Sequence, residues 1–200
     1  MWEEAAVGKI VRWNQVNPAF PDAPLKLLAP DARFESSDYF FAAVLGPGKP
    51  ARRDYMGSVD DNVLIQGVAR DVNTVGYLPV ATYLENRAKL RAVPIAKSAG
   101  AEPVAASAEA VLSGRYQPLS RPIFLYVNAV SLARADVAAF AEFYAANAAR
   151  LAEAAGYVAL TDTLYSTGRE RLRRRIPGSV WDGVVPVGLD VRELQRREAR

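Results

Sequence analysis

Short apolar runs alternate along this chain with stretches of helical spacing, and this alternation most restricts the fold that the chain can adopt. Residues 25–29 form an apolar run flanked by prolines, which is typical of a buried strand. A helix is expected over residues 38–45, because Ser36 or Ser37 can cap its start and Gly46 can end it. Repeated alternation of strands and helices predicts an α/β layer fold with a parallel or mixed sheet.

The same alternation continues to the end of the chain. Asp60, Asp61 and Asn62 precede an apolar stripe, so they are expected to begin a helix and to complement its dipole. Further strands are expected over residues 76–78, 92–95, 123–127 and 157–160, and further helices over residues 2–7, 80–90, 107–114, 134–155, 162–175 and 189–200. A Gly/Pro/Arg loop is expected over residues 47–58. The core face of the longest helix is assigned to Phe140, Phe143, Tyr144 and Leu151.

The composition excludes several classes of function. The chain contains no Cys and no His, which rules out disulfides, thiolate nucleophiles, His bases and ordinary zinc sites. No residue spacing indicates a Lys, Tyr or carboxylate mechanism. We therefore expect a protein that is not an enzyme and that carries neither a cofactor nor a metal.

The positive charge is concentrated late in the chain. The net charge is +3, and an arginine-rich run occupies residues 169–175. This run is either the solvated face of a helix or a nucleic-acid patch. It has no interleaved aromatic residues, which proteins that bind single strands usually show, so no nucleic-acid partner is expected. There is no apolar run of about 18 residues, and the start at Met1 lacks the features of a signal peptide.

Four stretches of the sequence carry a resemblance to a known family. They read GKIVRWNQVNPAFPDAPLKL (residues 8–27), DDNVLIQGVARDVNTVGYLPVATYLENRAKLRAVPI (60–95), YQPLSRPIFLYVN (116–128) and GYVAL (156–160). In order and spacing they resemble the phosphate-binding proteins of bacterial phosphate ABC transporters (PstS-like). The resemblance implies a type II periplasmic-binding-protein fold, in which two α/β lobes hold an anion between them.

On this resemblance, residues 1–117 correspond to the second lobe and residues 118–200 to the C-terminal part of the first lobe. The family's N-terminal segment, which supplies the opening strands of the first lobe, has no counterpart here. Residues 123–127 and 157–160 would then lack strands to pair with and would expose an apolar face. We expect a truncated product or one half of a split protein, whose partner would be a separately encoded N-terminal half.

The anion-binding loop of the family aligns with residues 30–36. The family has Pro-Gly-Thr-Asp-Ser-Gly-Thr before a helix, and its backbone N–H groups and hydroxyls hold the phosphate. Here Asp31 and Glu35 replace both glycines, and Phe34 replaces the serine. A carboxylate at ~4 Å from the anion costs roughly 4 kcal/mol at an effective dielectric of about 20.

Candidate phosphate ligands remain in and near this loop. Arg33 can offset the added carboxylates, and Ser36 keeps a hydroxyl at the position of the threonine. Ser36 and Ser37 are alternatively mere helix caps, and Glu35 alternatively occupies the anion site itself. Arg52 aligns with a family arginine that precedes an Asp-Tyr pair, and it is alternatively a solvated loop residue.

The resemblance implies a function without chemistry. The chain is expected to be the substrate-binding component of a phosphate ABC transporter, in incomplete form and with weakened phosphate binding. Its partners would be inorganic phosphate and a membrane permease, and its compartment would be periplasmic or extracytoplasmic. The alternative is a structural or interaction module with no ligand of its own.

Overall fold

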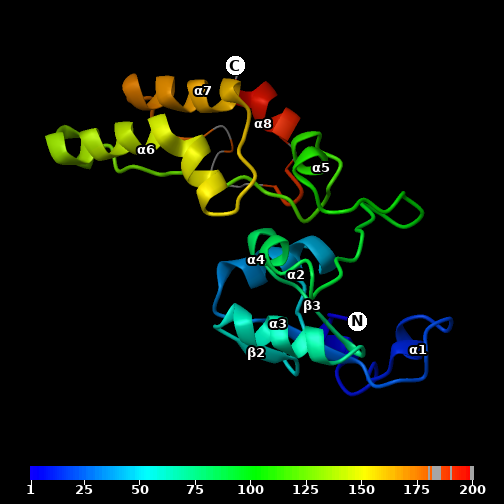
Figure 1. Cartoon of the computed structure of the whole chain (residues 1–200). Coiled ribbons are helices and arrows are strands. Elements are labelled where there is room, and N and C mark those ends of the chain that lie inside the picture. Colours follow the sequence, from blue (N-terminus) through cyan, green and yellow to red (C-terminus); the bar gives the residue numbers. More distant parts are fainter. Residues whose placement is uncertain (180, 182–185, 190, 199–200) are drawn as a thin grey trace. The chain divides into compact units, whose positions relative to one another are not determined.

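The protein is described from a computed structural model that covers residues 1–179, 181, 186–189 and 191–198. The chain divides into two compact units, Met1–Val93 and Pro94–Arg200, and each is described by itself (Figure 1). The division expected at residue 117 concerns the lobes of the family and stays a prediction. None of the described helices is both long and apolar enough to cross a membrane.

A parallel sheet lies at the centre of the first unit. Its strands are β1 (Lys26–Pro30), β2 (Met56–Ser58) and β3 (Thr74–Gly76), in the order β2-β1-β3. Pro30 lies opposite Ser58, and Leu28 lies opposite Gly76. The α/β prediction with a parallel sheet is confirmed. The expected loop over residues 47–58 is wrong at its end, because Met56, Gly57 and Ser58 pair with β1 as a strand.

Helices connect and cover these strands. They are η1 (Glu4–Ala6), α1 (Trp13–Val16), α2 (Glu35–Leu45), α3 (Asp61–Arg70) and α4 (Val80–Glu85). The predicted start of α3 is confirmed, because Oδ1 of Asp60 accepts a 2.8 Å hydrogen bond from the Asn62 N–H. The predicted end of α2 is also confirmed. Gly46 follows it with φ 104°, a conformation that a residue with a Cβ rarely adopts.

An aromatic cluster fills the core beside β1. Trp2 is buried among rings of α2 and of the segments that follow Arg52 and β3, and it packs with Leu27 and Ala29 of the strand. The rings around Trp2 are Phe40, Phe41, Tyr55 and Tyr77. Burial of these large apolar surfaces is the main force that holds α2 against the sheet.

The second unit is built from helices. They are α5 (Ala108–Leu112), η2 (Ser131–Ala133), α6 (Ala135–Ala154), α7 (Asp162–Arg173) and α8 (Val191–Glu198). Helices α6 and α7 pack against each other (Figure 1). The core contains the buried residues Leu164, Trp181, Leu189, Val191 and Leu194. Ser107 caps α5, because its hydroxyl accepts a hydrogen bond from the Ala110 N–H, and Thr161 caps α7 through the Leu164 N–H.

Three predicted strands do not form. Among the described residues of the second unit there is no strand, and residues 92–95 contribute only the isolated bridge between Ile95 and Val104. Residues 123–127 and 157–160 have strand-like sequences, but a strand exists only where a second strand pairs with its backbone. Among the described residues of this unit, no second strand pairs with either segment.

The predicted core face of α6 is also wrong for its aromatic residues. Phe140 and Phe143 are 63% and 58% exposed, and Tyr144 is 38% exposed. The buried residue of this helix is Ala141. The predicted aromatic face therefore lies at the surface of the unit, and a small residue occupies the packed face.

Candidate functional site

The carboxyl ends of the three parallel strands define the candidate site in the first unit. Pro30, Ser58 and Gly76 end the strands, and each strand is followed by a short segment and a helix. The Asp31 N–H donates a 3.0 Å hydrogen bond to the Ser58 carbonyl, which ties the β1–α2 loop to the end of β2. Open parallel sheets bind ligands at this edge, because helix N-termini and loop amides gather there.

Arg33 is held by a neighbour in the same loop. Its Nε lies 2.9 Å from Oδ1 of Asp31, and its Nη2 lies 3.3 Å from Oδ2. This guanidinium keeps the pKa of the Asp31 carboxyl below its ordinary value. The Arg33 side chain is 81% exposed, so it is accessible to a ligand, but Asp31 already neutralises part of its charge.

Ser37 lies inside the unit and not at its surface. It is 1% exposed, and its Oγ lies 3.3 Å from the Pro30 carbonyl and 3.2 Å from the Asp31 carbonyl. The Oγ also accepts a 2.9 Å hydrogen bond from the Tyr77 hydroxyl. The hydroxyl of Ser37 thus fixes the end of β1 and the start of the loop.

Ser36 is the hydroxyl residue that stays accessible in the first turn of α2. The prediction that Ser36 or Ser37 caps this helix is wrong. Phe34 occupies the N-cap, and no side chain caps there. The structure does not describe the side chain of Glu35. The hypothesis that its carboxylate occupies the anion site therefore falls outside the described residues.

Arg52 is buried and engaged within the protein. It is 5% exposed, and its Nε and Nη2 donate to the two carboxylate oxygens of Asp54 at 2.6 and 2.7 Å. Its Nη1 lies 3.1 Å from the Met1 carbonyl and 3.2 Å from the Ile10 carbonyl. A guanidinium has five N–H donors, so these contacts use most of its capacity. The interpretation of Arg52 as a solvated loop residue is wrong.

Tyr77 is the residue of this edge that the sequence did not identify. It directly follows β3, stacks on Phe40 with ring centroids 3.8 Å apart, and donates its hydroxyl to Ser37. Burial raises the pKa of Tyr77 to about 12. The available signal was an aromatic residue with a polar tip inside the predicted strand 76–78, whereas the observed strand ends at Gly76.

The acidic start of α3 has a structural role. The capping function of Asp60 is confirmed, and Oδ2 of Asp61 accepts a 2.8 Å hydrogen bond from the Thr82 hydroxyl of α4. These carboxylates hold two helix starts beside the sheet edge. They also add negative charge there, which disfavours an anion.

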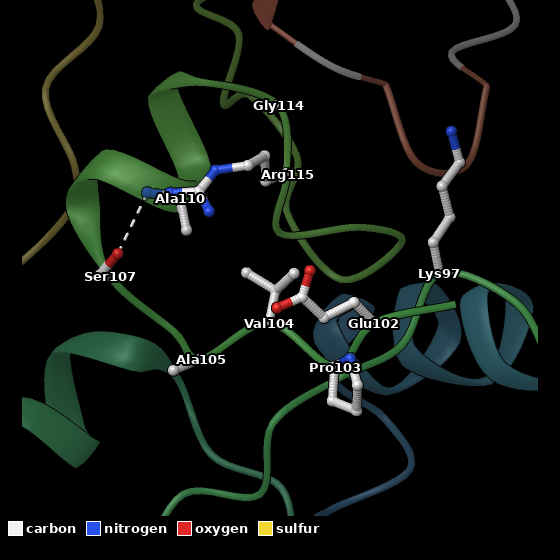
Figure 2. A pocket seen from close by; sticks show the side chains of 9 residues that line it. All are labelled: Lys97, Glu102, Pro103, Val104, Ala105, Ser107, Ala110, Gly114 and Arg115. Atoms are coloured by element: carbon white, nitrogen blue, oxygen red, sulfur yellow. Dashed lines mark hydrogen bonds between the residues drawn. The ribbon is translucent and has the colours of Figure 1, made fainter. Parts of the chain in front are cut away.

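A separate cavity lies within the second unit. It has a volume of about 370 Å³, and its lining includes Lys97, Glu102, Ser107 and Arg115 (Figure 2). Arg115 is committed to Glu109, with Nη2 2.5 Å from the carboxylate, and Ser107 accepts the Ala110 N–H. None of the four predicted phosphate ligands lines this cavity.

Comparison with known proteins finds relatives that match most or all of this chain. It is 38% identical over 200 residues to protein SphX of Synechocystis sp., covering all of the chain and 59% of that relative. It is 31% identical over 170 residues to the phosphate-binding protein PstS of Staphylococcus haemolyticus, covering 84% of the chain and 52% of that relative. No family model matches the chain.

A solved structure agrees with these relatives. It is the crystal structure of a protein from Planctomyces limnophilus described as "a possible phosphate binding protein". The TM-score is 0.75 at 32% identity, and the match covers 88% of this chain and 62% of that one. The chain spans somewhat more than half the length of the curated relatives it matches. In sequence and in fold, it is a homologue of protein SphX and of the phosphate-binding protein PstS.

Proposed function

We propose that this chain is the substrate-binding component of a phosphate import system, and that inorganic phosphate binds at the carboxyl edge of its parallel sheet. The observation that carries the proposal is the β1–α2 connection. In a chain that is homologous to the phosphate-binding protein PstS over 84% of its length, this loop brings an exposed arginine to the start of an eleven-residue helix. The helix N-terminus and the guanidinium both favour a dianion.

The proposed ligands are Arg33, Ser36 and the first backbone amides of α2. Ser37 supports the loop from inside, because its hydroxyl joins the end of β1 to Tyr77. Arg52 binds the carbonyl groups of Met1 and Ile10 and so holds the N-terminal segment of the unit. The competing hypothesis is that Arg52 is a phosphate ligand. The protein performs no chemistry in this role, and neither of the two curated relatives named above carries the name of an enzyme.

Binding is proposed to be weak. The Asp31 carboxylate already occupies Arg33, so phosphate must compete with a carboxylate that the loop itself supplies. Like charges within a few ångströms reduce anion affinity strongly. Docking on a membrane permease and an extracytoplasmic location are proposed on the homology alone.

Isothermal titration of phosphate into the purified chain tests the proposal. We expect a dissociation constant above the micromolar range, weaker binding in Arg33→Gln, and weaker binding at high salt. Arg134→Gln is the matched control, because Arg134 also forms an exposed ion pair with an aspartate two residues away, Asp136.

Two results would contradict parts of this proposal. Binding at micromolar concentration or tighter would show that the loop tolerates its carboxylates. Equal affinity of Arg33→Gln and the unchanged chain would place the site elsewhere. Sulfate in place of phosphate tests anion selectivity in the same experiment.

The alternative, an interaction module, is favoured by a different observation. The second unit exposes large apolar side chains along residues 123–126 and on α6. Exposed apolar side chains that gather into one patch mark an interaction site. A separately encoded N-terminal half is one partner that would cover it.

A further inference from the structure

The hydroxyl of Tyr55 is buried in the first unit and has no hydrogen-bond partner among the described residues. Tyr55 directly precedes β2, and its ring lies 6.0 Å from the ring of Trp2 and 6.1 Å from the ring of Phe41, measured between centroids. These neighbours fix the ring beneath α2. A buried donor without an acceptor destabilises the folded state, so this hydroxyl calls for an explanation.

Gly57 shows how close the ring of Tyr55 lies to the β1–α2 loop. Because Tyr55 and Gly57 are two residues apart in an extended segment, they face the same side of the sheet. A Cβ on Gly57 would lie 3.7 Å from Cε2 of Tyr55 and 3.7 Å from the Cα of Asp31. The edge of the ring and the residue that pairs with Arg33 are therefore both within van der Waals distance of one point.

The Tyr55 hydroxyl is a neutral donor near two carboxylates. Burial is the main cause that raises the pKa of this phenol; the charge of Arg53 lowers the pKa, and the charges of Asp31 and Asp38 raise it. Asp31 is the favoured acceptor, because its side chain is only 29% exposed. Asp38 is exposed, so water can hydrate its carboxylate.

The ion pair between Asp31 and Arg33 must open before an anion can take the guanidinium. Nε and Nη2 of Arg33 both donate to the Asp31 carboxylate. An anion that takes these donors leaves a half-buried carboxylate short of partners, which costs free energy.

We propose that Tyr55 is a positioning residue that replaces Arg33 as the side-chain donor to Asp31 when an anion engages Arg33. The ring is fixed by its aromatic neighbours, so the Asp31 carboxylate turns toward the hydroxyl. The new charge-assisted hydrogen bond satisfies both groups and lowers the cost of opening the ion pair. The effect on phosphate rests on the proposed function, whereas the exchange of donors can be measured without phosphate.

Removal of Arg33 tests the exchange in phosphate-free buffer. In Arg33→Ala, Asp31 has lost its guanidinium, so Tyr55 should donate to it. Adding Tyr55→Phe to this variant should lower the urea midpoint by about 0.5–1 M. In the unchanged chain, Tyr55→Phe should leave the midpoint the same or raise it, because the substitution removes a hydroxyl that has no partner. A merely structural role of Tyr55 predicts equal shifts in the two backgrounds.

Isothermal titration of inorganic phosphate measures the consequence for binding. Tyr55→Phe should raise the dissociation constant by about tenfold, because nothing then compensates Asp31 for the loss of Arg33. In the Asp31→Asn background, the same substitution should change the constant by less than about threefold. Tyr126→Phe is the matched control, because Tyr126 is 70% exposed in the second unit, and it should alter neither the midpoint nor the affinity.

Three outcomes would overturn the inference. Tyr55→Phe shifts the midpoint equally with and without Arg33, or it weakens phosphate binding as much in Asp31→Asn as in the unchanged chain. The third outcome is an effect that persists in Asp31→Asn and disappears in Asp38→Asn, which would make Asp38 the acceptor. Failure of the unchanged chain to bind phosphate, together with the expected shift in Arg33→Ala, would reject the proposed function and keep the exchange of donors.

Discussion

The carboxylate of Asp31 accepts three hydrogen bonds from Arg33, from its backbone N–H at 3.0 Å, its Nε at 2.9 Å and its Nη2 at 3.3 Å. Two residues of one loop therefore form a closed ion pair at the edge of the sheet. The arginine that could attract an anion is matched by an internal counter-ion. Asp31 is thus the residue that limits anion binding in the proposed site.

Asp31→Asn should strengthen phosphate binding. The amide keeps a carbonyl acceptor but no charge, so the Arg33 guanidinium becomes available to the anion. We expect the dissociation constant to fall by about tenfold in isothermal titration. Asp136→Asn, in the similar pair with Arg134, is the control and should have no effect. Unchanged affinity in Asp31→Asn would remove Arg33 from the site.

Ser37→Ala should destabilise the first unit. The substitution removes the acceptor of the Tyr77 hydroxyl and leaves a polar group half-buried without its partner. The expected loss in free energy of unfolding is about 1–3 kcal/mol, measured by urea denaturation. Ser166→Ala removes a hydroxyl from the exposed face of α7 and should change stability by no more than about 0.5 kcal/mol. An equal loss of unfolding free energy in the two variants would show that the buried hydrogen bond contributes nothing to stability.

The raised pKa of Tyr77 predicts a loss of stability at high pH. The folded protein keeps this phenol neutral up to about pH 12, because the ring is buried, whereas the unfolded chain ionises it near pH 10. The contribution is fully present below pH 10 and falls between pH 10 and 12, since only the unfolded state loses the proton there. Urea denaturation at pH 9 and 11 measures it. Tyr77→Phe should show a shallower decline, and an identical decline would contradict the assignment.

Gly76→Ala should disrupt the pairing of β1 with β3. A Cβ at this position would lie 2.5 Å from the Leu28 carbonyl oxygen, which is backbone and cannot turn aside. We expect a loss of about 1–3 kcal/mol in the free energy of unfolding. Gly168→Ala is the opposite case, since its Cβ would meet nothing within 4 Å in α7. That change should raise stability by about 0.5–1 kcal/mol.

Arg52→Gln should lower stability without changing the phosphate affinity of the folded protein. The substitution removes the bidentate contact to Asp54 and the donors to the Met1 and Ile10 carbonyls. Because Asp54 is partly exposed and can be solvated, we expect a loss of about 2 kcal/mol. Denaturation and isothermal titration separate the two roles. Weaker phosphate binding at unchanged stability would instead support Arg52 as a ligand.

Local signals in the sequence determined much of the first unit. The apolar run before Pro30 predicted β1, Asp60 predicted the start of α3, and Gly46 predicted the end of α2. These features depend on neighbours within a few residues, such as a cap or a left-handed glycine, so a linear pattern contains them. The four family-like stretches likewise indicated the homology that the comparisons show.

Only the tertiary structure decided which residues face inward and which segments find partners. Ser37 and Arg52 are buried because distant groups surround them, among them Tyr77 and the Met1 carbonyl. Met56–Ser58 is a strand because β1 lies beside it, whereas residues 123–127 remain unpaired because no described strand does. Pairing and burial depend on contacts between residues far apart in sequence, and the chain's own pattern does not specify whether those contacts exist.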